Sequence, residues 1–191
     1  MRLFAAVLPP ADVLAELGTA VDPLHRIPGA ERLRWADRTG WHFTLAFYGE
    51  VAEELLPGLH ERLARAARRH DPYELCLARG GRFGHRVMWV GAEGDRTTMR
   101  SLADSAAAGA RRAGVAMEDQ RPYDTPHLTI ARSRGRRPEV DLVPFVTALA
   151  EFTSVTWTAG ELTLMRSHPP EAGVPGAQPR YEAVGRWPLG H

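Results

Sequence analysis

Two short segments of the chain repeat one pattern: His42-Phe43-Thr44-Leu45-Ala46 and His127-Leu128-Thr129-Ile130-Ala131. In both, histidine, threonine and alanine alternate with apolar residues, and no other His-x-Thr occurs in the sequence. Residues two apart on a strand share a face, so this alternation predicts two half-buried strands with an unusual polar face.

The apolar residues of these strands are expected to anchor them in the core. They are Phe43, Leu45 and Phe47 in the first strand and Leu128 and Ile130 in the second. On the opposite face, Ala46 and Ala131 are small, so they are expected to leave room for a ligand beside each histidine and threonine.

Further strands and helices are predicted on both sides of the motifs. Expected strands cover residues 3–8, 73–78, 86–90, 155–157, 162–165 and 181–187, and expected helices cover 11–21, 55–69, 97–112 and 140–152. Gly80-Gly81 is expected to form a turn, and residues 169–179, rich in Pro and Gly, a loop. Strands that follow one another directly predict an α+β fold with mostly antiparallel pairing, and the doubled order suggests two related lobes.

Length and composition predict one domain over residues 1–191, made of two intertwined lobes, because 191 residues with 44% hydrophobic side chains can bury a core. The apolar run 3–8 is too short for a signal peptide, and no stretch approaches the roughly 20 apolar residues of a membrane span. Cys76 is the single cysteine, which excludes an internal disulfide. We therefore expect a cytoplasmic monomer with no membrane association and no obligatory protein partner.

All 24 basic residues are arginine, although the formal net charge is only +1. The densest run is Arg132, Arg134, Arg136 and Arg137, directly after the second motif. This run has two interpretations. It can be a solvated surface loop, or it can face a phosphate, because an arginine side chain binds two phosphate oxygens at once.

The two motifs together suit a phosphodiester. If the strands are neighbours, His42, Thr44, His127 and Thr129 bring two imidazoles and two hydroxyls to one small volume. Hydrolysis needs one group that accepts a proton from water and one that donates a proton to the leaving oxygen, and histidine can do either near neutral pH. The threonine hydroxyls are expected to donate hydrogen bonds to the phosphate oxygens.

Zinc binding by His42 and His127 is the competing interpretation. Catalytic zinc usually takes three protein ligands, and the sequence places no His-x-x-x-His or paired cysteine near either motif to supply the third. We therefore predict that no metal and no other cofactor is bound.

The chain resembles the 2H phosphoesterase superfamily, and within it the bacterial and archaeal RNA 2′,3′-cyclic phosphodiesterases once called 2′-5′ RNA ligases. The resembling segments are residues 2–6, Arg34-Trp35, residues 42–51 and residues 126–132. The resemblance implies two pseudo-symmetric lobes of mostly antiparallel sheet with helices outside and the active site in the central cleft. It also implies metal-independent hydrolysis of the cyclic phosphate to a 2′-phosphomonoester, with His42 as proton donor and His127 as base.

The predicted substrate-binding residues lie outside the two His-x-Thr repeats, so the repeated pattern does not identify them. Arg132 matches the phosphate-contacting arginine of the family, yet its position five residues after His127 gives it the opposite strand parity. Arg134 is a further candidate, and Phe4 is expected either to stack on a base or to pack in the core. Residues 123–125 make the approach to the second motif one residue longer than in the family, and a bulge is expected there.

RNA ends are the substrate expected from the resemblance. Small cyclic nucleotides, 2′-5′ linked oligonucleotides and reverse ligation to a 2′-5′ bond use the same chemistry, so the motifs do not separate them. An RNA-end binding module without turnover is the alternative from another class, although binding alone does not require a base.

Overall fold

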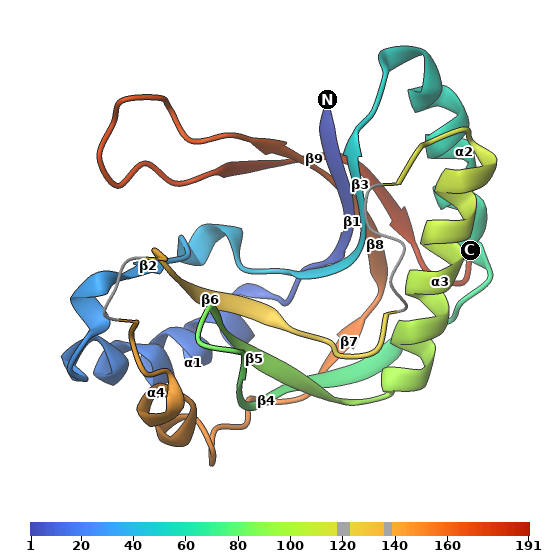
Figure 1. Ribbon diagram of the computed structural model, residues 1–191. Coiled ribbons are helices and arrows are strands. Elements are labelled where there is room, and N and C mark those ends of the chain that lie inside the picture. The colour runs from blue at the N-terminus through green and yellow to red at the C-terminus, as the bar shows by residue number, and fades with distance from the viewer. Residues whose placement is uncertain (118–122, 136–138) are drawn as a thin grey trace.

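The computed structural model describes residues 1–117, 123–135 and 139–191, and within these ranges nine strands form one antiparallel sheet (Figure 1). The strands are β1 (Arg2–Val7), β2 (Leu33–Trp35), β3 (Phe43–Glu50), β4 (Tyr73–Phe83), β5 (Val87–Gly94), β6 (Leu128–Ser133), β7 (Trp157–Ala159), β8 (Glu161–His168) and β9 (Arg180–Pro188). The α-helices are α1 (Ala11–Val21), α2 (Leu56–Arg68), α3 (Arg96–Arg112) and α4 (Val143–Ala148). Short 3₁₀ helices span Asp22–Arg26, Ala30–Arg32, Arg38–Gly40 and Glu53–Leu55. The predicted α+β class with antiparallel pairing is confirmed.

The sheet divides into two halves at its centre. Its strand order is β7-β4-β5-β6-β3-β1-β8-β9, with β2 beside β6. Lobe 1 consists of β3, β1, β8 and β9, and lobe 2 of β6, β5, β4, β7 and β2. The pairing of Phe43 with Leu128 joins the lobes, so each lobe begins at the centre with its own motif strand.

The helices cross between the lobes. α3 follows a strand of lobe 2 but packs against α2 and against β3 of lobe 1. α1 follows β1 of lobe 1, whereas the Glu16 carboxylate accepts a hydrogen bond from Val155 N, 3.1 Å away, just before β7 of lobe 2. Figure 1 accordingly shows α2 with α3 on one side of the molecule and α1 with α4 on another. None of the described helices is long and apolar enough to cross a membrane.

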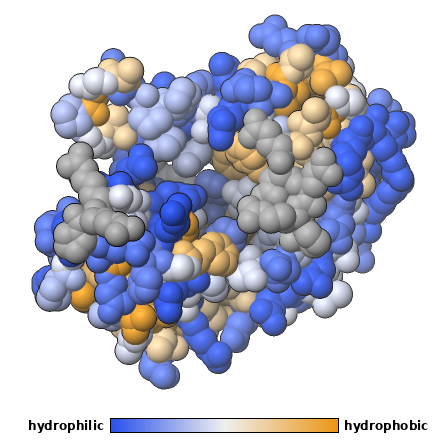
Figure 2. Space-filling model, viewed as in Figure 1, coloured by the Kyte–Doolittle hydropathy of each residue, from blue (hydrophilic) through white to orange (hydrophobic). Residues whose placement is uncertain are grey.

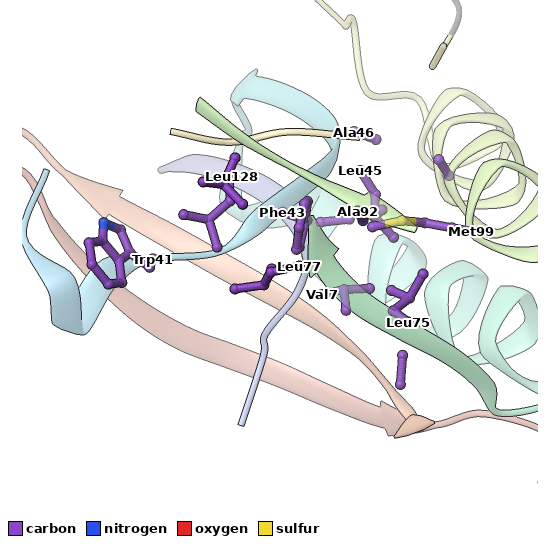
Figure 3. Packing of buried hydrophobic residues seen from close by; sticks show 14 of the residues in the cluster. Val7, Trp41, Phe43, Leu45, Ala46, Leu75, Leu77, Ala92, Met99 and Leu128 are labelled. Carbon is purple, nitrogen blue, oxygen red and sulfur yellow. The ribbon is translucent and has the colours of Figure 1, made fainter. Parts of the chain in front are cut away.

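One continuous core lies beneath both motif strands. Phe43 and Leu128 are fully buried in it. Figure 3 shows these two side chains among apolar residues of other elements, including Leu77 of β4 and Met99 of α3. The two motif strands therefore share one apolar support.

Each motif strand bulges at the residue after its threonine. In β3, Thr44 pairs with Ala6 and Ala46 with Ala5, so Leu45 has no partner on β1. In β6, Thr129 pairs with Trp89 and Ala131 with Met88, and the residue between them, Ile130, is passed over on β5. A bulge puts two consecutive residues opposite one and so shifts the alternation of faces by one position.

These bulges change the expected faces of two residues. Ala46 is buried in the main core and does not line the cavity, contrary to the prediction, whereas Ala131 is buried but lines the cavity beside Thr129. Phe47, predicted in the core with Phe43 and Leu45, lies instead on the open face beside Phe4, Ala6 and Met165. The sequence alternation therefore holds only up to each bulge.

Two other local predictions were wrong, and one strand was not predicted. Gly80-Gly81 is not a turn, because β4 runs through it and the hairpin turns at Gly84; a Cβ on Gly81 would lie 2.2 Å from the Trp89 ring, so glycine serves close packing there. The helix predicted over 140–152 is confined to α4, since Pro144 lies in its first turn and the residues after it form tighter i to i+3 turns. Residues 33–35 form β2, which was not predicted.

The bulge expected at residues 123–125 is not found there, because this segment precedes β6 and is not a strand. Arg136 and Arg137 of the basic run lie outside the described residues.

Phe43→Ala is expected to lower the free energy of unfolding by about 3–5 kcal/mol, because it empties the fully buried site where the two lobes meet. Urea unfolding followed by circular dichroism measures this. Phe47→Ala is the matched control, since Phe47 is half-buried on the open face. A loss for Phe43→Ala no larger than that of the control would contradict the central role of the β3–β6 contact.

Candidate active site

A cavity of about 530 Å³ lies between the lobes and is lined by residues of both motifs. Its lining residues are Arg2, Phe4, Arg34, Ala36, Asp37, Gly40, His42, Thr44, Phe47, His127, Thr129, Ala131, Arg132, Ser167, Pro169, Pro170, Gln178, Pro179 and Tyr181. Figure 2 shows this face of the molecule hollowed near its centre, with mostly hydrophilic surface around the hollow. The structure thus brings together the four predicted catalytic residues, His42, Thr44, His127 and Thr129.

Each motif histidine stands directly before its strand and is held in the same way. His42 Nδ1 lies 2.6 Å from Gly40 O, and His127 Nδ1 lies 3.0 Å from Thr125 O. A carbonyl oxygen only accepts, so Nδ1 carries the hydrogen in both rings. In the neutral form of each ring, Nε2 is therefore the nitrogen with a free lone pair.

The two threonines differ in their hydrogen bonding. Thr44 Oγ1 lies 3.0 Å from His42 Nε2. With Nδ1 as the donor to Gly40, the neutral His42 ring accepts the Thr44 hydroxyl hydrogen at Nε2. Among the described residues, no corresponding hydrogen bond joins Thr129 to His127. The Thr129 hydroxyl is therefore not engaged by the histidine of its own motif.

Aromatic rings hold each imidazole from its own lobe. On lobe 1, the Phe4 ring centroid lies 4.7 Å from that of His42, and the Tyr181 ring meets His42 edge-on at 5.1 Å. On lobe 2, Phe83 meets His127 edge-on at 4.9 Å. These contacts restrict the orientation of both imidazoles.

Phe4 is 3% exposed and packs against His42 and Tyr181. Its predicted packing in the core is therefore present, in the small cluster on the open face of lobe 1. Stacking of a base on Phe4 stays a prediction. The more exposed ring on this wall is Tyr181, at 37%.

Burial lowers the pKa of His42 below its usual value near 6.5. The hydrogen bond to Gly40 opposes this shift, and the charge of His127 acts with burial. The Coulombic coupling of the two imidazoles agrees with their placement on one cavity. At neutral pH, His42 is therefore mainly uncharged in the free protein.

Arg132 lines the cavity, which resolves its apparent parity conflict. The bulge at Ile130 returns Arg132 to the face of Thr129. Burial raises the pKa of Tyr181, and the positive charge of Arg132 opposes that shift. Arg134 is exposed beyond the end of β6 and is not among the residues lining the cavity. Its predicted role in substrate binding is not supported by its position.

Sequence reasoning missed several residues of the site. Tyr181 comes from β9, whose register on β8 no local pattern predicts. Gly40 supplies the carbonyl that holds His42, and a Cβ there would lie 2.8 Å from the Tyr181 ring. A glycine two residues before a candidate catalytic histidine was a signal that could have indicated this close packing.

The described residues contain no group of three or more His, Cys, Asp or Glu side chains placed to hold a metal ion. Metal independence itself stays a prediction, to be tested with a chelator.

Comparison with known proteins identifies related sequences over most of the chain. A sequence model described as the 2′-5′ RNA ligase superfamily matches residues 10–171. A protein of Archaeoglobus fulgidus named RNA 2′,3′-cyclic phosphodiesterase is 32% identical over 146 residues, covering 73% of this chain and 77% of the relative. A protein of Geobacillus stearothermophilus with the same name is 28% identical over 160 residues, covering 81% of this chain but 47% of the relative, about half its length.

Solved structures share the fold over the whole chain. Apo E. coli LigT has a TM-score of 0.75 at 25% identity, covering 100% of this chain and 98% of the other. E. coli LigT complexed with 3′-AMP gives 0.76 at 25% identity with the same coverage. The TT0787 protein of Thermus thermophilus gives 0.77 at 25% identity, again covering 100% and 98%.

The His42 ring is expected to titrate below pH 6.5 in the free protein. NMR of protein labelled with ¹³C-histidine measures the midpoint, and the spectrum of His42→Gln assigns the signal. The unfolded chain binds more protons than the folded protein between the folded pKa and 6.5. The contribution of His42 to stability is therefore present above about pH 6.5 and is lost as the pH falls through the folded pKa. A midpoint at or above 6.5 would contradict the buried setting of this ring.

Proposed function

Because the chain belongs to the 2′-5′ RNA ligase superfamily, we propose that it hydrolyses RNA ends carrying a 2′,3′-cyclic phosphate to 2′-phosphomonoesters. The observation that carries the proposal is the pair of imidazoles, both held through Nδ1 by a carbonyl two residues earlier and both lining one cavity. The names of the relatives at about 30% identity support the same activity.

The proposed reaction joins two proton transfers to one displacement at phosphorus. His127 Nε2 takes a proton from water while the water oxygen bonds to phosphorus. The bond from phosphorus to the 3′ oxygen breaks, and His42 Nε2 gives its proton to that oxygen. The phosphate stays on the 2′ oxygen, and the two histidines have exchanged protonation states, which solvent restores.

His42 must gain a second proton before it can act as the acid. Burial disfavours this in the free protein, but the negative charge of a bound phosphate favours the imidazolium and raises its pKa. Protonation at Nε2 also releases the Thr44 hydroxyl hydrogen, because Nε2 then donates instead of accepting. Thr44 is then free to donate to a phosphate oxygen, so substrate binding and acid formation support each other.

Positioning and charge supply the rest of the proposed catalysis. The Thr129 hydroxyl, without a bond to its own histidine, is available to a phosphate oxygen, and Arg132 adds a positive charge on the same face. One acid or base typically contributes roughly 10² to 10⁴ in rate, so fixed hydrogen bonds to the phosphate must contribute much of the remainder.

The first test is turnover of an oligoribonucleotide ending in a 2′,3′-cyclic phosphate, in excess EDTA. The expected product is the 2′-phosphomonoester, identified by ³¹P NMR, because His42 donates its proton to the 3′ oxygen. A 3′-phosphate would reverse the leaving oxygen, and activity restored only by added zinc would refute metal independence. Tight binding without turnover would leave the non-catalytic RNA-end module as the function.

The second test is removal of each imidazole. His42→Ala and His127→Ala are each expected to lower kcat/KM by about 10²- to 10⁴-fold, since each loses one proton transfer. His60→Ala is the matched control, because His60 lies on α2 against Trp187, away from the cavity lining. Circular dichroism checks that all three variants fold. A loss of less than tenfold in either motif variant would remove that histidine from the mechanism.

A further inference from the structure

Arg34 and Arg132 stand directly opposite one another on neighbouring strands. Arg34 of β2 pairs in register with Arg132 of β6, and both line the cavity. Side chains of directly opposed residues project from the same face of a sheet, with their Cβ atoms about 4.5–5.5 Å apart. Two guanidinium groups are therefore presented together at one wall of the active-site cavity.

This pair carries two positive charges without an acidic partner among the described residues. Like charges directly opposite each other disfavour strand pairing. Other arginines of the chain are paired with carboxylates, such as Arg186 with Glu161. Asp37 also lines the cavity, but its carboxylate accepts hydrogen bonds from the Thr39 amide and hydroxyl, which lower its pKa. An anion bound between the two arginines would relieve their repulsion.

The arginine pair is displaced from the catalytic centre along β6. Thr129 pairs with Trp89 and Arg132 with Val87, so the bulge leaves Arg132 two residues of β5 beyond Thr129, which is about 7 Å at roughly 3.3 Å per residue. This separation suits two successive groups of a nucleotide better than two oxygens of one phosphate.

The β8–β9 loop borders the arginine pair. Gln178 of this loop donates a hydrogen bond to Trp35 O, 2.7 Å away, directly beside Arg34, and Gln178 also lines the cavity. The part of the cavity next to the arginine pair is therefore limited on one side by the β8–β9 loop.

We propose that Arg34 and Arg132 form a second anion subsite, which binds another phosphate of the substrate next to the cyclic phosphate. The inference rests on the proposed function for the identity of that substrate. The ligand chemistry is a phosphate: the preceding phosphodiester of an RNA chain, or a terminal 5′-phosphate of a small nucleotide. Arginine suits this role because its planar guanidinium binds two phosphate oxygens at once.

Three substrates test the proposal in excess EDTA. Adenosine 2′,3′-cyclic phosphate has no second phosphate, its 5′-phosphorylated form has a terminal one, and the dinucleotide ApA ending in a 2′,3′-cyclic phosphate has a phosphodiester. Wild-type protein is expected to prefer at least one of the last two over the first by about 10- to 100-fold in kcat/KM, the range of a charge-assisted contact. The preferred one identifies the source of the phosphate.

Arg34→Gln is expected to reduce this preference to about threefold or less, because it removes one of the two guanidinium groups of the subsite. Arg34→Lys keeps the positive charge but cannot bind two phosphate oxygens as a planar guanidinium does, so an intermediate preference is expected. Arg100→Gln is the matched control, since Arg100 is an exposed arginine of α3 that does not line the cavity. For the dinucleotide, Arg34→Gln should also reduce the slope of log affinity against log salt by about 0.7.

Equilibrium binding separates failure of the subsite from failure of the proposed function. Calorimetry compares adenosine 2′-phosphate with adenosine 2′,5′-bisphosphate on wild type and Arg34→Gln. Tighter binding of the bisphosphate that is lost in Arg34→Gln supports the subsite even if no substrate is turned over, in which case the proposed function fails alone. Turnover with equal preference in wild type and Arg34→Gln, and no difference in binding, would overturn the subsite and leave the proposed function standing.

Discussion

The contact of β3 with β6 at Phe43 and Leu128 is the constraint on which the site depends. Each motif histidine lies one residue before its member of this pair, and because the two strands run antiparallel, the register of one buried contact places the two imidazoles on either side of the pair, both lining the cavity. The apolar side chains that fix the register point into the core, and the polar groups point to the cavity. The sheet halves, the crossed helices and the shared core all hold this junction in place.

A second constraint fixes the chemistry of the rings. The carbonyls of Gly40 and Thr125 leave Nε2 of each histidine as the reactive nitrogen, and aromatic neighbours restrict both imidazoles. The rings are nevertheless not equivalent, because Thr44 contacts His42 and burial lowers the His42 pKa. In the proposed reaction this asymmetry separates the roles: the negative charge of the bound phosphate favours protonation of His42, which then acts as the acid, and His127 acts as the base.

The motif residues could be predicted from the sequence because their signal is local. Alternation with a period of two needs only neighbouring residues, and it correctly placed His42, Thr44, His127 and Thr129 on one side of their strands. The bulges could not be predicted, because they arise from pairing with β1 and β5, and the bulged strand β3 shows faces of Ala46 and Phe47 opposite to those expected. Tyr181 and the pairing of Arg34 with Arg132 likewise depend on contacts between segments distant in sequence.

The central claim is that both imidazoles act on a single phosphorus atom. A crystal structure with a nucleoside vanadate, which mimics five-coordinate phosphorus, tests it most directly. The account predicts the vanadium in the cavity between the lobes, with His42 Nε2 and His127 Nε2 each within hydrogen-bond distance of an oxygen on opposite sides of it. Vanadate in contact with only one imidazole, or bound outside this cavity, would contradict the account.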